Sequence, residues 1–95
     1  MTVIVAGALH VDPAERDAYL AGCQALIATA RRTAGCVDFH LSPDPIEAGR
    51  INVYEEWESV EAVDAFRGSG PPVGQLATIR EAHVFQHEVS TTIEL

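Results

Sequence analysis

The alternation of hydrophobic and polar residues predicts where the regular elements of this chain begin and end. A hydrophobic N-terminal run predicts a strand over residues 3–10. The next segment has the composition of a helix start: Asp12 can act as the N-cap, a proline suits the first turn, and Glu15 completes a capping-box-like pattern. In the helix that follows, hydrophobic side chains recur every three or four residues and share one face: Tyr19, Cys23, Leu26, Ile27 and Ala30.

The middle of the chain predicts two strands in succession. Gly35 can adopt the left-handed conformation that ends a helix. Residues 36–41 then alternate hydrophobic with polar side chains, the hydrophobic set being Val37, Phe39 and Leu41. Residues 42–49 contain two prolines and predict a connecting loop. A second strand is predicted over residues 51–57, and it ends at the single tryptophan of the chain, Trp57.

The C-terminal part predicts one more helix and one more strand. Ser59 is placed as the N-cap of a helix over residues 60–67. Glycines and prolines at 68–72 break that helix, and a short amphipathic segment follows, with Val73, Leu76 and Ile79 as its hydrophobic positions. Residues 82–91 predict the last strand.

The element order β-α-β-β-α-β predicts an α+β fold with a four-stranded antiparallel sheet. Right-handed crossovers make 4-1-3-2 the expected strand order, which is that of a ferredoxin-like sandwich. The chain has 95 residues and no internal linker, so we expect one domain over residues 1–95.

Two of the predicted strands have hydrophobic residues on both faces, and this predicts a partner. In the first strand Ile4 and Val5 point to opposite faces, and in the last strand Val84 and Phe85 do the same. Two helices cover only one face of a sheet, so a monomer would expose the second hydrophobic face to water. We therefore predict an obligate homodimer that packs sheet against sheet, a dimeric α+β barrel.

Charge and composition limit the partners and the compartment. The chain has 14 acidic against 6 basic residues, a formal charge of −8, which disfavours nucleic acid and anionic membranes as partners. The hydrophobic N-terminal run has no basic flank and is too short to span a membrane, so we expect a cytoplasmic protein. Cys23 and Cys36 do not have the spacing of a zinc site and are expected to be reduced thiols.

The sequence predicts no metal site and no cofactor. His83 and His87 are four residues apart on one strand, about 13 Å at about 3.3 Å per residue, too far to share one ion. The chain has no HExxH, CxxC, glycine-rich phosphate loop or Gly-x-Ser-x-Gly motif. We therefore expect a protein that works without metal, haem or organic cofactor, and we expect its histidines to be solvated or at an interface.

Two segments of the chain resemble a known family. The pair Gly35-Cys36 precedes an aromatic-containing strand, and the run Glu-Glu-Trp-Glu-Ser at residues 55–59 is followed by Glu61-Ala62. Together with the order and length of the elements, this pattern resembles the antibiotic biosynthesis monooxygenase family. Its members are small dimeric ferredoxin-like proteins that include cofactor-independent anthrone and quinol oxygenases, and the superfamily also includes haem-degrading enzymes.

The resemblance implies a function and a site. A deprotonated polycyclic phenol, anthrone or quinol is electron-rich enough to pass an electron to dioxygen directly, so the protein must bind the ring, favour the anion and orient the oxygen. The period of a strand places Val53, Glu55 and Trp57 on one face. We predict that Glu55 is the general base. The predicted pocket for a small aromatic substrate lies between the helices and the sheet, lined by Trp57, Val53, Phe66 and Phe39.

Other positions depart from the family pattern. Anthrone-oxygenase-like members have an asparagine four residues before the tryptophan, where this chain has Val53. Quinol-oxidising and haem-degrading members commonly have a histidine in the second helix, near the position of Phe66. The alternative is therefore a non-catalytic dimeric module that binds a small molecule or is associated with stress. In that case the tryptophan is a core residue and Glu55 pairs with Arg50 or Arg80.

Overall fold

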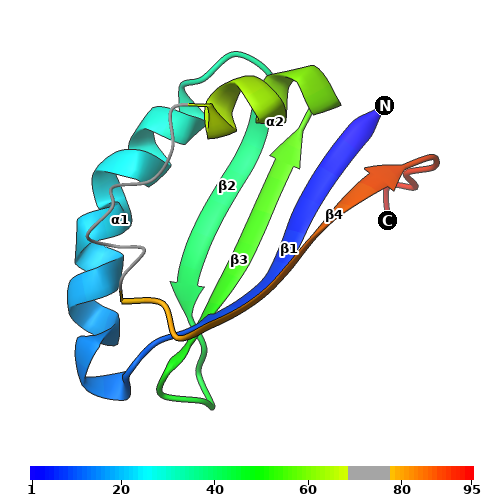
Figure 1. Ribbon diagram of the computed structural model, residues 1–95. Helices are drawn as coiled ribbons and strands as arrows, with labels where there is room; N and C mark the ends of the chain where they lie inside the picture. The colour runs from blue at the N-terminus through cyan, green and yellow to red at the C-terminus, as the bar shows by residue number, and fades with distance from the viewer. Residues whose placement is uncertain (69–77) are drawn as a thin grey trace.

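The computed structural model describes residues 1–68 and 78–95 of the chain. Its elements follow in the order β1 (Thr2–His10), the 3-10 turn η1 (Pro13–Glu15), α1 (Arg16–Arg31), β2 (Cys36–Pro43), β3 (Arg50–Trp57), α2 (Val60–Arg67) and β4 (Glu81–Val89). This order confirms the predicted β-α-β-β-α-β arrangement and the α+β class (Figure 1). Helix α2 ends at Arg67 with Gly68 as its C-cap, as predicted. The rest of the predicted break, residues 69–72, and the amphipathic positions Val73 and Leu76 lie outside the described residues, and Ile79 lies in neither a helix nor a strand. Within the described ranges no helix is long and apolar enough to cross a membrane.

All four strands form one antiparallel sheet in the order β2-β3-β1-β4, which is the predicted ferredoxin-like arrangement. In the centre of the sheet, Val5 of β1 lies opposite Glu55 of β3 on one side and Gln86 of β4 on the other. Figure 1 shows α1 running beside β2 and α2 crossing the upper end of the sheet, while β4 lies on the side away from α1. The helices therefore cover β2 and β3 more than they cover β4.

The hydrophobic core lies between the helices and the face of the sheet that carries Val5. Its buried members come from three strands and both helices: Val3, Val5, Ala30, Phe39, Trp57 and Val63. Trp57 is the largest of them and is 0% exposed. On α1, Cys23 and Ala30 are buried on the predicted hydrophobic face, because that face packs against the sheet.

The start of the first helix differs from its prediction. Residues 13–15 form a single 3-10 turn, and the α-helix begins at Arg16. Asp12 Oδ1 accepts a hydrogen bond of 2.9 Å from the backbone N–H of Ala14, and the N–H of Glu15 donates to the carbonyl of Asp12 at 2.8 Å. The second bond joins residues three apart and tightens the turn. Asp12 therefore caps the 3-10 turn, Glu15 makes no side-chain cap bond to α1, and the capping-box prediction is wrong.

Strand β2 begins with an irregularity that its alternation did not predict. The register with β3 shifts between Cys36 and Asp38, so that Val37 falls outside the alternation of the strand and is 54% exposed. The prediction that Val37 lies on the hydrophobic face is therefore wrong. Phe39, after the shift, is buried in the core as predicted.

The turn between α1 and β2 depends on Gly35. Its φ of 85° lies in the left-handed region that was predicted for this position and that favours glycine. A Cβ on Gly35 would also lie 2.5 Å from the Cβ of Ala62. The helix itself ends earlier, at Arg31 with Arg32 as its C-cap, so the prediction that Gly35 ends the helix is wrong. The glycine instead completes the turn into β2 and allows α2 to approach the start of β2, which brings α2 over the aromatic end of β3.

The opposite face of the sheet, which we call the outer face, mixes hydrophobic and polar side chains. The register places Ala6 of β1 opposite Tyr54 of β3 and Phe85 of β4 on this face. The same parity assigns to it all four histidines of the chain: His10, His40, His83 and His87. Phe85 is 62% exposed. The second hydrophobic surface predicted for β1 and β4 is thus present, but it is shared with titratable groups.

Candidate functional site

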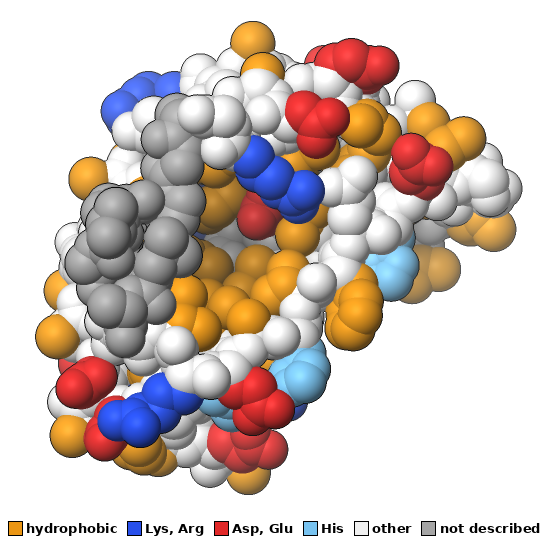
Figure 2. All heavy atoms as spheres, in the orientation of Figure 1, with side chains coloured by type: hydrophobic (Ala, Val, Ile, Leu, Met, Phe, Trp, Pro, Cys, Tyr) orange, Lys and Arg blue, Asp and Glu red, His pale blue; other side chains and the backbone are white. Residues whose placement is uncertain are grey.

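A hollow opens on the helix-covered face of the sheet. Figure 2 shows it over the strands below α2, with hydrophobic side chains over most of its visible floor. A cationic and an acidic side chain lie next to one another at its upper margin. The half-buried hydrophobic residues packed against the core include Ile27, Leu41, Phe66 and Val84. A concave, mostly apolar surface with a few polar groups is the usual form of a small-molecule site.

Glu55 is the acidic residue of β3 on this face. Its Oε1 accepts a hydrogen bond of 3.0 Å from Nε1 of Trp57, because residues two apart on a strand point to the same side. The side chain is partly buried, and burial raises the pKa of the Glu55 carboxyl above its usual 4.5. The indole hydrogen bond and the charge of Arg67 act in the opposite direction without cancelling this effect. A carboxylate with a raised pKa is a stronger base than an ordinary carboxylate and is better suited to accept a proton.

The arginines that would have paired with Glu55 in the structural alternative have other partners. Arg50 Nε donates to Asn52 Oδ1 at 2.7 Å, and Arg80 lies 3.8 Å from Asp12. The cation that influences Glu55 is instead Arg67, in the last turn of α2. This residue was not predicted from the sequence.

The predicted pocket residues form an aromatic cluster beneath α2. The rings of Trp57 and Phe66 have centroids 5.1 Å apart, and those of Phe39 and Phe66 are 5.6 Å apart with an interplanar angle of 64°. Trp57 is 0% exposed, Phe39 3% and Val53 7%. Only Phe66 among the four is half-buried. The fold brings the three aromatic residues together, while Val53 is buried two residues before Glu55 on the same face of β3. Phe66 and the neighbouring Glu55 are the residues that a ligand could reach without opening the core.

Arg67 extends from α2 towards β4. Its Nη1 donates a hydrogen bond of 2.8 Å to Oε1 of Gln86. Gln86 belongs to the same cross-strand row as Glu55, with Val5 between them. The guanidinium is therefore held over the helix-covered face, close enough to Glu55 for its charge to favour the ionised carboxylate.

A separate pocket lies on the flank of α1. It has a volume of about 320 Å³ and is lined by Glu15, Ala18, Tyr19, Gly22 and Thr78. None of the predicted site residues lines it. Burial, with a smaller contribution from Cys23, raises the pKa of Tyr19 to about 12, so that its hydroxyl stays protonated at neutral pH.

Metal-binding and thiol chemistry have little support on this face. Within residues 1–68 and 78–95, no group of three or more His, Cys, Asp or Glu side chains is arranged to hold a metal ion. Cys36 lies at the edge of the aromatic cluster. Burial raises the pKa of the Cys36 thiol, and the negative charges of Glu55 and Asp38 raise it further. The thiolate that nucleophilic catalysis requires is therefore disfavoured.

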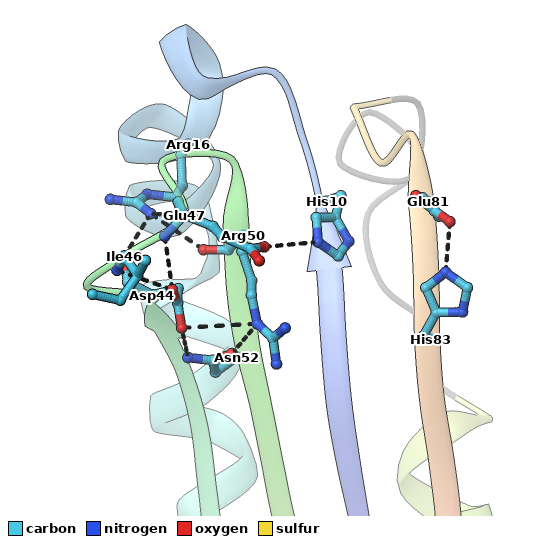
Figure 3. A network of polar contacts seen from close by, with 9 residues as sticks. All are labelled: His10, Arg16, Asp44, Ile46, Glu47, Arg50, Asn52, Glu81 and His83. Atoms are coloured by element: carbon cyan, nitrogen blue, oxygen red, sulfur yellow. Dashed lines mark hydrogen bonds and ion pairs between the residues drawn. The ribbon is translucent and has the colours of Figure 1, made fainter.

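A polar network secures the loop between β2 and β3 (Figure 3). Asp44 accepts hydrogen bonds from the backbone N–H groups of Ile46 (3.0 Å) and Glu47 (2.8 Å) and from Nδ2 of Asn52 (2.9 Å). These bonds lower the pKa of Asp44 to about 2. Arg16 Nη1 donates to the carbonyl of Glu47 at 2.9 Å and so joins the loop to α1. The network stabilises the loop and the end of the sheet.

Two histidines lie near the same end of the sheet, on the outer face (Figure 3). His83 Nε2 is 2.6 Å from Glu81 Oε1, and His10 Nε2 is 3.5 Å from Glu47 Oε2. The two ring centroids are 6.5 Å apart. Each ring faces its own carboxylate, and the pair does not form a metal site with the other described residues.

Solved structures show where this fold recurs. Rv0793 from Mycobacterium tuberculosis has a TM-score of 0.81 at 22% identity, with 99% of this chain and 100% of that chain covered. A candidate antibiotic biosynthesis monooxygenase from Caulobacter crescentus CB15 has a TM-score of 0.84 at 20% identity, with coverage of 95% and 91%. A similar candidate from Nitrosomonas europaea has a TM-score of 0.78 at 14% identity, with coverage of 96% and 100%. At these identities the similarity establishes the ferredoxin-like fold.

Sequence comparison identifies the family. No curated protein matches the chain. The sequence model of the antibiotic biosynthesis monooxygenases, in contrast, matches residues 2–88. That range includes every described element from β1 to α2 and nearly all of β4. The chain therefore belongs to the antibiotic biosynthesis monooxygenase family.

Proposed function

We propose that this protein is a cofactor-independent monooxygenase that oxidises a polycyclic phenol, anthrone or quinol-like aromatic with dioxygen. The observation that carries the proposal is the environment of Glu55. Its carboxyl group has a raised pKa and lies beside an aromatic cluster on a hydrophobic face. An acidic aromatic substrate requires a base in such a position. Membership of the monooxygenase family supports chemistry with oxygen.

The reaction balances without a cofactor. For an anthrone, the Glu55 carboxylate takes a proton from the ring methylene, the carbanion gives one electron to dioxygen, and the two radicals join in a C–O bond. The peroxide receives the proton back from Glu55. Loss of the second methylene proton then forms the carbonyl and breaks the O–O bond, releasing hydroxide that takes up that proton. One oxygen atom enters the product, and the other leaves as water with both methylene hydrogens.

The neighbouring side chains have distinct parts in this proposal. Trp57 is a positioning residue, because its indole N–H orients the Glu55 carboxylate. Phe66 is half-buried and offers an aromatic surface on which a planar ring can stack. Val53 occupies the position where anthrone-oxidising relatives have an asparagine, so polar contacts to the substrate oxygen must come from another element.

Oxygen consumption by the purified protein tests the proposal. A panel of anthrones and hydroquinones is supplied with and without a metal chelator, and dissolved oxygen is followed. We expect uptake that the chelator does not change and that falls at least about a hundredfold in Glu55→Gln. Glu58→Gln is the matched control, because Glu58 is exposed beyond the end of β3. Full activity in Glu55→Gln would exclude Glu55 as the base, and no uptake with any substrate of the panel would count against an oxygenase.

The burial of Trp57 supports a second function. Its ring is 0% exposed and its N–H is satisfied by Glu55, which is the arrangement of a tryptophan that stabilises a core. On this basis the alternative is a non-catalytic dimeric module that binds a small aromatic molecule. Saturable quenching of Trp57 fluorescence by members of the panel, without oxygen uptake, would favour this alternative.

We also propose that the protein is a cytoplasmic homodimer in which the outer faces of two sheets meet. Phe85 is 62% exposed, and it lies on the same face as Ile4 and Ala6. A partner copy would remove this surface from water. The two cysteines are free thiols, as expected in a reducing compartment.

A further inference from the structure

We infer that Arg67 selects ligands that carry a negative charge, and that Gln86 holds Arg67 in position to do so. The inference rests on the proposed function, because it concerns the same face of the sheet as Glu55. It narrows the ligand to an aromatic molecule with an ionised oxygen.

The strand register defines the geometry of this face. Glu55, Val5 and Gln86 are successive members of one row across β3, β1 and β4. Neighbouring strands lie about 4.8 Å apart, so the backbones at Glu55 and Gln86 are separated by about 10 Å. Val5 is 2% exposed, so there is no room for a ligand between Glu55 and Gln86 at the level of the strands. A ligand would therefore lie above the row, at the level of the Glu55 carboxylate and the Arg67 guanidinium.

The hydrogen bond from Arg67 to Gln86 orients the guanidinium without neutralising it. Nη1 donates to the amide oxygen of Gln86 at 2.8 Å, and an amide carries no charge. The guanidinium has five N–H donors in one plane, so this single bond leaves donors for a further acceptor. Among the described residues, no salt bridge involves Arg67.

Four other arginines differ from Arg67 in place or in partner. Arg16 and Arg31 are likewise held by neutral acceptors, backbone carbonyls at 2.9 Å, but Arg16 lies at the β2–β3 loop and Arg31 also contacts Nδ1 of His40. Arg50 and Arg80 each lie 3.8 Å from an aspartate. The formal charge of −8 disfavours anionic ligands over most of the surface. A local cation held by a neutral partner is therefore needed wherever this protein is to bind an anion.

Arg67 and Glu55 complement one another towards an acidic aromatic ligand. When Glu55 has taken the proton of a phenol or an enolisable ketone, the negative charge remains on the ligand oxygen. N–H donors from Arg67 would stabilise that oxygen through charge-assisted hydrogen bonds. Arg67 is thus a specificity-determining residue for the ionised form, and Gln86 is its positioning residue.

Two fluorescent dyes separate charge from hydrophobic contact in a test of this inference. Anilinonaphthalene sulfonate and phenylnaphthylamine share an aromatic scaffold and differ by the sulfonate. Both are titrated into the full chain at neutral pH and low salt. We expect Arg67→Gln to weaken binding of the sulfonate dye about tenfold and to leave binding of the neutral dye unchanged. Gln86→Leu should give a smaller loss of the same kind, because the charge remains but is no longer oriented.

Two further variants control for charge and for geometry. Arg32→Gln removes the same charge from the C-cap of α1, where the side chain is exposed, and should change neither affinity. Arg67→Lys keeps the charge but not the planar donors, so its affinity for the sulfonate dye should lie between those of wild type and Arg67→Gln.

Three outcomes would overturn the inference. They are an equal loss of both dyes in Arg67→Gln, no loss of either dye in that variant, and failure of the wild-type chain to bind the sulfonate dye. None of these outcomes depends on oxygen uptake. A chain without oxygenase activity can still bind anions through Arg67, and an active chain can fail to do so, so the two proposals fail in different experiments.

Discussion

Trp57 donates its indole N–H to the carboxyl group of Glu55, two residues earlier on the same face of β3, with 3.0 Å between Nε1 and Oε1. The carboxyl group of Glu55 thus accepts the hydrogen bond of an indole that is 0% exposed, while burial raises the pKa of the carboxyl group. One hydrogen bond therefore serves both stability and the proposed chemistry. The two roles can be separated, because an amide keeps the acceptor oxygen but cannot take up the proton.

Replacing Glu55 by glutamine and by alanine should separate these roles in stability measurements. Glu55→Gln retains an acceptor for the indole, so its free energy of unfolding near pH 5 should be close to that of wild type. Glu55→Ala leaves the N–H of Trp57 buried without a partner and should cost about 1–3 kcal/mol. Urea unfolding followed by tryptophan fluorescence measures both values. Equal stability of the two variants would show that the hydrogen bond does not stabilise the indole.

The pH dependence of stability should also reflect Glu55. Its pKa in the folded chain is raised above the usual 4.5, so the native state binds this proton more tightly than the unfolded state does. The resulting stabilisation is fully present below the unfolded pKa and is lost as pH rises through the folded pKa. As pH rises from below the usual 4.5 through the folded pKa, the stability of Glu55→Gln should therefore rise relative to wild type. A constant difference over this range would contradict the burial of the carboxyl group.

Periodic features of the fold could be predicted from the sequence, and local competition between backbone conformations could not. The alternation that placed Val53, Glu55 and Trp57 on one face is confirmed by their pairing with β1. Val37 belonged to an equally regular alternation, but a register shift at the start of β2 removed it from that face. Asp12 had the composition of an α-helix cap, yet it caps a 3-10 turn, because its side chain satisfies the nearest free N–H.

The candidate site was predictable only in part, since it depends on contacts between distant segments. The strand period could place Glu55 beside Trp57. It could not give the hydrogen bond from Arg67 to Gln86 across 19 residues, because this contact requires the register of β4 against β1. The burial of Trp57 likewise depends on how α2 brings Phe66 to 5.1 Å from its ring, which one sequence does not specify.

Substitutions of Trp57 should affect both the core and the carboxyl group. Trp57→Ala should cost about 3–5 kcal/mol of stability as a truncation in the core. Trp57→Phe should cost less, but it removes a hydrogen bond that lowers the pKa of Glu55. In that variant the acid limb of a kcat/KM profile should move to higher pH, because Glu55 must be ionised to act as a base. An unmoved limb would show that the indole does not influence the group that titrates.

Asp44 should control stability in acid. Its pKa of about 2 lies below the usual 3.8, chiefly because of the hydrogen bond from the backbone of Glu47. A depressed pKa gives stability that is present above the unfolded pKa and lost as pH falls through the folded pKa. Asp44→Asn should therefore lower the thermal midpoint at pH 7 and flatten its fall between about pH 4 and about pH 2. Asp64→Asn, an exposed change on α2, is the control. If the thermal midpoints of Asp44→Asn and wild type fell in parallel with pH, the assignment would be refuted.

The assembly can be tested through Phe85, which is 62% exposed on the outer face and lies opposite Ala6 of β1. In the proposed dimer this ring is buried between two sheets, so Phe85→Glu should place a charge in the interface and release monomers without unfolding them. Light scattering at micromolar concentration should give about twice the chain mass of 10.2 kDa for wild type and about 10.2 kDa for the variant. Val37→Glu changes another exposed hydrophobic residue, 54% exposed at the start of β2, and should leave the dimer intact. A wild-type protein that stays folded at the mass of one chain would mean that the outer face tolerates water, and the proposed dimer would have to be abandoned.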